Sequence, residues 1–307
     1  MKVQWDGHDM GTWDQAHAQA AGALQQDWAY GSTRVSLGSS VLRAVVHADG
    51  APVAMAQFIA RRFGKWAGFA LCSRGPIWLQ QLSGTDKAKA YKALRKSIPL
   101  PGLRWLMVTP DEALSDPLGL PHLRRIMTGY ATVMLDISQP MAQLRDNLDK
   151  RWRAPLSSAE KSELVIHRMG TNPGQYRWLL DAEMQQRERR GFQGYPDIWF
   201  ERYAESRKQP AKNILSIRAD VGRDRVAAMM FLLHGEAATY QVGWTSDAGR
   251  DLHAHHLILW KGIEELKQRG IRQLDLGGVN TQRSAGIARF KMATGGTVKV
   301  LAGSYLL

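Results

Sequence analysis

The chain has 307 residues, 44% of them hydrophobic, and a mean hydropathy of −0.33, which suits a water-soluble protein of two modest domains. Its single cysteine, Cys72, excludes an intrachain disulfide and a cysteine-based metal cluster. Lysine and arginine number 41 against 28 acidic residues, so the net charge of +13 favours a polyanionic partner such as nucleic acid, nucleotide phosphates or an anionic membrane surface. No apolar run is long enough to span a bilayer and the N-terminus lacks a signal-peptide core, so we expect a cytoplasmic protein without a transmembrane segment.

The first half opens with an amphipathic pattern that predicts one helix over residues 12–30, ending near Gly31. Two apolar runs, 41–47 and 52–61, flank an Asp-Gly pair, which is typical of a β-hairpin. Further along, the patterns predict a helix over 86–97 and strands over 68–72, 103–108 and 131–137.

The second half begins with a predicted helix over 139–152, which we expect Pro155 to end. Helices are then predicted over 173–190, 197–207 and 247–269. Between and after them, apolar runs predict strands over 164–168, 214–219, 225–233, 237–243 and 271–276.

The order of strands and helices therefore recurs in the two halves. The runs VAMAQF (53–58) and VAAMMF (226–231) occupy equivalent places in this order. Such a repeat indicates a duplicated α/β unit, with a division near residues 138–155.

Common catalytic motifs are absent: there is no phosphate-binding loop, no HExxH and no GxSxG. His253, His255 and His256 form a small cluster on a predicted helix, where a metal site would need carboxylates or more histidines beside them, so we expect no metal site. Arg250 stands where N-acetyltransferases carry an arginine before a glycine pair that binds pyrophosphate, but the glycines are missing. This counts against binding of coenzyme A in the C-terminal half.

Several ordered segments together resemble one family. LDLGG (274–278), GIARFK (286–291), TGG (294–296) and GSY (303–305) follow one another in the last third, and LQQDWAYGSTR (24–34) and SRGPIW (73–78) precede them. In this order they resemble the FemA/FemB/FemX aminoacyl transferases of the GNAT-like superfamily.

The resemblance implies an α/β (α+β) fold of two tandem GNAT-like acyltransferase domains, expected over residues 1–142 and 143–307. It further implies an aminoacyltransferase that moves an amino acid from aminoacyl-tRNA to an amine of a peptidoglycan-precursor peptide. The expected partners are charged tRNA, the precursor or another amine, and a membrane surface touched peripherally. No cofactor is expected beyond the donor.

Candidate site residues follow from this resemblance. Lys291 is the expected catalytic cation, because a cation stabilises the oxyanion that forms during aminolysis of an ester, and Asp275 is expected to orient substrate or to hold the glycine turn. Substrate binding is expected from Arg34, Arg74, Gly75, Trp28, Tyr30, Gly277, Gly278, Phe290 and Tyr240. Contact with tRNA or another anion is expected from Lys150, Arg151, Arg153 and Arg250.

Two alternatives stay open at this point. The first is an N-acyltransferase that uses acyl-CoA on a small metabolite or peptide amine. The second is a non-catalytic nucleic-acid-binding protein of duplicated acyltransferase fold. Loss of transfer on substitution of Lys291, with binding retained, distinguishes an enzyme from the second alternative.

Overall fold

The computed structural model describes residues 1–120, 124–189, 194–282 and 284–307, and it divides the chain into two compact units. Unit 1 comprises Met1–Ala131 and Lys299–Leu307, and unit 2 comprises Thr132–Val298. The division expected at 142/143 falls instead within helix α4 (Met141–Asp146) of unit 2. The last residues return to unit 1 because strand β15 (Ser304–Leu306) pairs with β6 (Leu103–Thr109).

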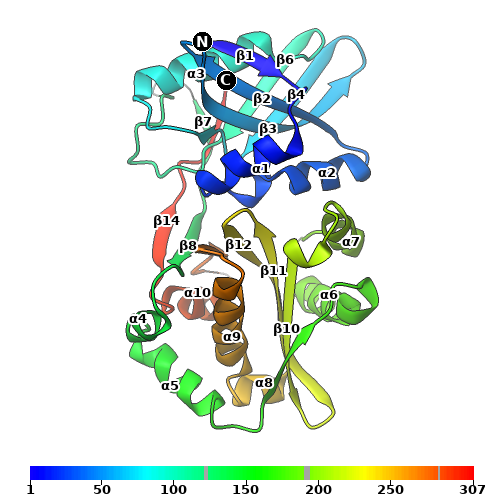
Figure 1. Cartoon of the computed structure of the whole chain (residues 1–307), viewed down its shortest axis with the longest axis vertical. Helices are drawn as coiled ribbons and strands as arrows, with labels where there is room; N and C mark the ends of the chain where they lie inside the picture. The colour runs from blue at the N-terminus through cyan, green and yellow to red at the C-terminus, as the bar shows by residue number, and fades with distance from the viewer. Residues whose placement is uncertain (121–123, 190–193, 283) are drawn as a thin grey trace. The chain divides into compact units, whose positions relative to one another are not determined.

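Unit 1 is built on a sheet whose described strands follow the order β1-β2-β3-β4-β6-β15-β7, with β5 beside β3 (Figure 1). Neighbouring strands are antiparallel except β4 and β6, which are parallel. The remaining strand bounds are β1 (Lys2–Trp5), β2 (Ser40–Ala48), β3 (Ala51–Phe63), β4 (Ala67–Ser73), β5 (Ile77–Trp78) and β7 (Arg125–Met127).

The predicted hairpin is confirmed as β2 and β3. Asp49 and Gly50 form its turn with φ of 51° and 84°. A two-residue turn with positive φ at both positions matches the twist of the flanking strands, which is why Asp-Gly is favoured there.

Helices cover both faces of this sheet. Phe58 packs in one cluster with Tyr91 and Leu94 of α3, whereas Met55 packs in another with Trp13 of α1. Odd and even positions of a strand point to opposite faces, so the two clusters lie on the two sides of β3. The helices of unit 1 are α1 (Met10–Gln19), η1 (Leu24–Gln26), α2 (Trp28–Ser36) and α3 (Gly84–Ser97).

The single helix predicted over 12–30 is wrong, because the chain breaks after α1. Ala21 adopts φ of 47°, and η1 separates α1 from α2. Gly31 does not end a helix but lies inside α2, where an added Cβ would sit 2.1 Å from Gln57 Oε1. The glycine therefore allows α2 to approach the sheet closely.

Unit 2 has a second sheet, whose described strands follow the order β14-β8-β13-β12-β11-β10-β9. Strands β9 to β12 are antiparallel neighbours, and β12 pairs in parallel with β13. The bounds are β8 (Ala131–Asp136), β9 (Val165–Met169), β10 (Ile214–Val221), β11 (Asp224–His234), β12 (Ala237–Thr245), β13 (Gln273–Val279) and β14 (Thr297–Val300).

Helix α9 lies along strands β10 and β11, and α5 packs on α9, while α6 contacts β12 (Figure 1). Buried Trp152, Phe231, Ile258 and Leu274 belong to the core of this unit. Besides α4, the helices are α5 (Lys150–Ala159), α6 (Pro173–Arg189), α7 (Asp197–Glu205), η2 (Pro210–Lys212), α8 (Asp247–Asp251), α9 (Ala254–Gln268) and α10 (Ala285–Met292).

Two predicted helices of unit 2 are each divided. The break in the first lies between α4 and α5, where Asp149 caps α5, and Pro155 lies inside α5 rather than ending a helix. The second is broken by His253, whose φ is 55°. The end predicted at Arg190 lies outside the described residues. Among the described helices, none has an apolar stretch long enough to cross a bilayer.

Candidate active site

The parallel strands β12 and β13 stop pairing part-way along their length. Their register runs from Ala237 opposite Gln273 to Thr239 opposite Asp275. Immediately beyond it, β12 bulges against β11, since Met230 pairs with Val242 while Phe231 pairs with Tyr240. Beyond this point, the backbone groups along the facing edges of β12 and β13 are not hydrogen-bonded to each other.

Helix α10 returns the chain to this point. Lys291, in its last turn, is 8% exposed, and its Nζ donates a hydrogen bond of 3.0 Å to the carbonyl oxygen of Gly278. The same Nζ lies 5.6 Å from the centroid of the Tyr240 ring, which is within the range of a cation–π contact. The fold thus brings together Lys291, Tyr240, Gly277 and Gly278, four residues expected at the site from the sequence.

The ionisation of Lys291 is perturbed. Burial lowers the pKa of its ammonium from 10.5 to about 8, although the negative charge of Asp275 opposes this shift. A group with this pKa is mostly a cation at neutral pH, yet it is close to releasing its proton. Perturbed pKa values of this kind are typical of catalytic groups.

Asp275 is 4% exposed and acts on the turn beside the lysine. Its Oδ1 accepts hydrogen bonds from Thr132 Oγ1 at 2.5 Å and from the Gly277 amide at 2.8 Å. Gly277 adopts a φ of 75° in this turn, which is favourable for glycine and unfavourable for other residues. The geometry fits the second of the roles expected for Asp275, holding the glycine turn.

Phe290 precedes the lysine and packs in an aromatic cluster. Its ring centroid lies 5.7 Å from that of Trp152 and 5.1 Å from that of His256. Burial lowers the pKa of His256 to about 4, so this ring is neutral at pH 7. The three rings line a cavity of about 430 Å³ together with Asp149, Arg151, Arg289, Met292 and Ala293.

The expected tRNA or anion residues separate into two groups. Arg151 lines the aromatic cavity, and Lys150 is exposed beside it in the chain. By contrast, Arg153 donates to the carbonyls of Asp146 and Leu148 at 2.8 and 3.0 Å, and so satisfies the end of α4. Arg250 forms an ion pair with Asp247 one turn away. No group of three or more described His, Cys, Asp or Glu side chains is placed to hold a metal ion.

The remaining expected residues lie in unit 1. Arg74 is 7% exposed, and its Nε lies 2.5 Å from Asp111 Oδ1, in an ion pair that Lys299 joins at 3.2 Å. An added Cβ on Gly75 would lie 2.6 Å from the side chain of Gln26. Arg74 is therefore ion-paired within the fold, and Gly75 is packed against Gln26 with no room for a side chain.

Helix α2 carries Trp28, Tyr30 and Arg34. The guanidinium of Arg43 stacks on Trp28, with Cζ 3.6 Å from the ring centroid, and Tyr30 is buried. The buried Nε of Arg34 has no hydrogen-bond partner among the described residues.

A polar network beside α2 was not anticipated from the sequence. The side chain of Gln57 accepts a hydrogen bond from Arg43 Nε at 2.8 Å through Oε1 and donates one to the carbonyl of Asp27 at 2.9 Å through Nε2. The backbone amide of Gln57 donates to Gln26 Oε1 at 2.8 Å. The available signal was the glutamine itself, which interrupts the apolar run VAMAQF.

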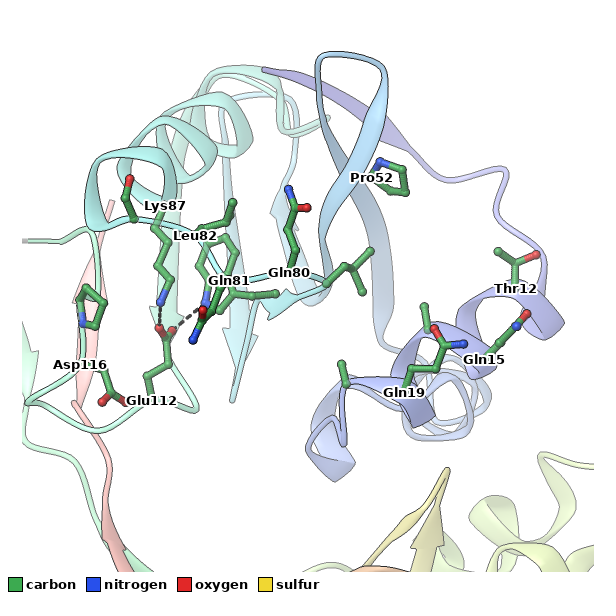
Figure 2. A pocket seen from close by; sticks show the side chains of 16 residues that line it. Thr12, Gln15, Gln19, Pro52, Gln80, Gln81, Leu82, Lys87, Glu112 and Asp116 are labelled. Carbon is green, nitrogen blue, oxygen red and sulfur yellow. Dashed lines mark hydrogen bonds and ion pairs between the residues drawn. The ribbon is translucent and has the colours of Figure 1, made fainter.

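Unit 1 also contains a cavity of about 1180 Å³ that includes none of the expected site residues. Figure 2 shows Gln15 and Gln19 of α1 across the hollow from Gln80 and Gln81. At one side Glu112 forms an ion pair with Lys87 and accepts from Trp78 Nε1 at 2.8 Å. The cavity therefore offers neutral amides, with the Lys87–Glu112 ion pair and the carboxylate of Asp116 at one side.

Comparison with known proteins identifies the fold. Residues 144–292, most of unit 2, match the family model described as an acetyltransferase (GNAT) domain. The crystal structure of FemX superimposes with a TM-score of 0.79 over 99% of this chain and 96% of FemX, at 14% identity. The chain has the FemX-type fold.

Other proteins share this FemX-type fold at lower similarity. A conserved protein of unknown function from Bacteroides thetaiotaomicron gives a TM-score of 0.61 at 10% identity, covering 99% of this chain and 98% of its own. A tandem GNAT protein from the clavulanic acid biosynthesis pathway gives 0.54 at 14% identity, covering 100% and 98%. No curated protein matches the sequence.

These findings confirm the predicted tandem GNAT-like fold, and they confirm the predicted resemblance to FemX at the level of the fold. The match to the acetyltransferase model also confirms the predicted enzyme class, an acyltransferase.

Proposed function

We propose that this acyltransferase moves an aminoacyl group from aminoacyl-tRNA to an amine of a peptidoglycan-precursor peptide. The observation that supports it most is the placement of Lys291, a buried cation with a lowered pKa at the point where β12 and β13 stop pairing. Because charged tRNA is a cytoplasmic substrate, the proposal also places the protein in the cytoplasm.

The chemistry is aminolysis of an ester. The neutral amine of the acceptor attacks the ester carbonyl and forms a tetrahedral intermediate with a negative oxygen. Lys291, as an ammonium, stabilises that oxygen, for which a dry site is worth a few kcal/mol. The bond from carbon to the ribose oxygen then breaks, the amide forms, and the ribose hydroxyl leaves with the proton that the amine gave up.

For the donor, we rely on the aromatic cavity beside α10, whose lining includes Phe290, the residue that precedes the lysine. The partly buried Phe290 offers an aromatic ring at its wall, and the exposed Arg151 and Arg289 offer positive charge. Aromatic rings flanked by arginine suit the bases and phosphates of single-stranded RNA. The net charge of +13 agrees with such a partner.

For the acceptor, we propose the cavity of unit 1. Its volume of about 1180 Å³ exceeds the range of ordinary small-molecule sites, about 300–1,000 Å³, and admits a peptide-sized group. The side chains of Gln15, Gln19, Gln80 and Gln81 can each donate and accept hydrogen bonds, as peptide groups require.

A second candidate is N-acylation by acyl-CoA, favoured by the match of residues 144–292 to an acetyltransferase model. The turn after β12 reads Ser246-Asp247-Ala248-Gly249-Arg250-Asp251, without a glycine pair following Arg250. In addition, Arg250 is paired with Asp247 rather than directed to a ligand. Both facts favour the tRNA donor.

The test is to incubate the protein with a peptidoglycan-precursor peptide and either a pool of charged tRNA or a set of acyl-CoA thioesters. Mass spectrometry should show one aminoacyl residue added to the precursor with the tRNA pool only, and none with Lys291→Ala. Addition from the thioesters would select the second candidate. An unchanged precursor with both donors would reject the enzyme-substrate assignment.

A further inference from the structure

The tip of the hairpin formed by β3 and β4, together with the start of β6, exposes large apolar side chains. Phe63, Trp66, Leu103 and Trp105 are 53%, 77%, 60% and 39% exposed. We call these four residues the apolar tip. Single exposed apolar residues are ordinary on protein surfaces, but a group of this size that the fold does not cover indicates an interaction surface.

The strand register gathers most of the apolar tip on one face. Phe63 lies opposite Ala67, which lies opposite Leu103, and in the next row Arg61 lies opposite Phe69, which lies opposite Trp105. Residues paired across strands share a face of the sheet. Phe63, Leu103 and Trp105 therefore point the same way, with Arg61 among them.

Two turns fix this surface in place. The amide of Leu103 donates to the carbonyl of Trp66 at 2.8 Å. Gly102 has φ of 54°, and an added Cβ there would lie 1.9 Å from the Trp66 oxygen, so the turns before β4 and β6 are in direct contact. The apolar tip is thus preorganised rather than carried by independent loops.

Positive charge lies on both faces of the sheet at the apolar tip, with Arg61 on the face of Phe63 and with Arg62 and Arg104 on the other. Arg61, Arg62, Lys65 and Arg104 are all exposed, and Lys65 Nζ lies 5.8 Å from the Trp66 ring centroid. Between residues 50 and 110 the only acidic residue is Asp86, which Lys89 neutralises at 2.8 Å. This segment of the chain therefore carries no negative charge that could balance these four cations.

We infer that the apolar tip docks unit 1 onto an anionic membrane surface. Tryptophan and phenylalanine settle at the level of lipid headgroups, and arginine and lysine beside them bind lipid phosphates. A second copy of the chain is a poorer occupant, since a two-fold interface would bring the four cations against their own copies. Nucleic acid is also a poorer occupant, because the aliphatic side chain of Leu103, which is 60% exposed, cannot stack on a base. The inference does not depend on the donor or acceptor proposed above.

The experiment is sedimentation of the full-length protein with vesicles of phosphatidylcholine alone or with phosphatidylglycerol added. We expect binding to the anionic vesicles and little to the neutral ones. Phe63→Ala with Trp66→Ala should lower the partition coefficient about tenfold or more, as expected for losing buried aromatic area. Reversal of Arg61, Arg62 and Lys65 to Glu should lower it about a hundredfold, at about fivefold per charge removed.

Matched controls separate this surface from net charge and general apolarity. Reversal of Lys161, Lys208 and Arg223 to Glu changes the net charge equally at exposed sites of unit 2, and Val165→Ala removes an apolar side chain that is 51% exposed. Both controls should bind vesicles within about twofold of the parent chain. Circular dichroism should give all variants the same melting temperature, because the substituted side chains are exposed.

Equal binding to neutral and anionic vesicles, or unchanged binding by the tip variants, would overturn the inference. So would a concentration-dependent dimer that the tip variants abolish without any binding to vesicles. Loss of tRNA binding in the tip variants, with vesicle binding unaffected, would assign the surface to nucleic acid instead. None of these results bears on whether Lys291 supports transfer.

Discussion

The side chain of Lys291 and the backbone of Gly278 are joined by a hydrogen bond of 3.0 Å from Nζ to the carbonyl oxygen. Lys291 lies in the last turn of α10 and Gly278 lies near the end of β13, so this bond links the helix to the end of the strand. Gly278 is exposed, which leaves its oxygen open to water or to a competing donor. A substrate oxygen can therefore replace the Gly278 carbonyl as the acceptor of the Lys291 ammonium, and water can then hydrogen-bond to that carbonyl.

Replacing Lys291 should separate function from stability. Lys291→Met removes the proposed oxyanion contact, and we expect transfer to fall by at least about a hundredfold. At pH 7 the same change should stabilise the protein by about 2 kcal/mol, because the buried ammonium opposes folding. Urea unfolding and single-turnover transfer measure the two effects, and a loss of stability at pH 7 would contradict the burial argument.

The stability difference should depend on pH in a defined direction. The unfolded chain keeps the lysine proton up to about pH 10.5, whereas the folded chain keeps it only to about 8. In that window the unfolded state binds more protons, so the parent chain gains stability as the pH rises. The advantage of Lys291→Met should therefore shrink between pH 8 and pH 10, and a constant advantage would show that the pKa of Lys291 is not lowered.

The rate of transfer should show the same ionisation. If the ammonium stabilises the oxyanion, kcat falls on the alkaline side with an apparent pKa near 8. Lys291→Arg keeps its charge to much higher pH, so any residual activity should lose this alkaline limb. Asp275→Asn removes the charge that supports the ammonium and should move the limb to lower pH. If the apparent pKa of the alkaline limb is the same in Asp275→Asn, the charge of Asp275 does not support the ammonium.

The turn at Gly277 offers a sharper test of geometry. Gly277→Ala forces a side chain into φ of 75° and should cost about 1 kcal/mol, while lowering kcat at least about tenfold by shifting the turn. Gly270→Ala is the matched control, since Gly270 has φ of 81°, an open surrounding and a place at the end of α9. It should cost similar stability and leave kcat unchanged. Equal effects on kcat would mean that the turn matters only for folding.

The cavity of unit 1 predicts a change in acceptor affinity alone. Gln80→Ala with Gln81→Ala removes two amides from its wall and should raise the KM for the peptide acceptor about tenfold, with kcat and the KM for the donor unchanged. Gln209→Ala, at an exposed position of unit 2, is the control. A rise in the KM for the donor instead would assign the cavity to the other substrate.

Several features followed from the sequence because their causes are local. The Asp-Gly turn between β2 and β3 needs only two residues that accept positive φ, and alternation and apolar runs placed most strands within a few residues. The segments LDLGG and GIARFK indicated the residues that gather around Lys291. They did so as a resemblance, since nothing in their spacing alone brings residue 278 against residue 291.

Tertiary contacts decided the rest. Gly31 reads as a helix end, but it lies inside α2 because Gln57 on β3 occupies the space of its side chain. Arg74 and Arg153 read as free cations for a substrate, but Asp111 and two helix-end carbonyls bind them. The sequence by itself determined most of the strands and the repeat, because these depend on neighbours along the chain, and it indicated the candidate lysine only through a resemblance to a family. Which charges are buried, paired or open to a ligand depends on residues far apart in the sequence, so only packing could determine it.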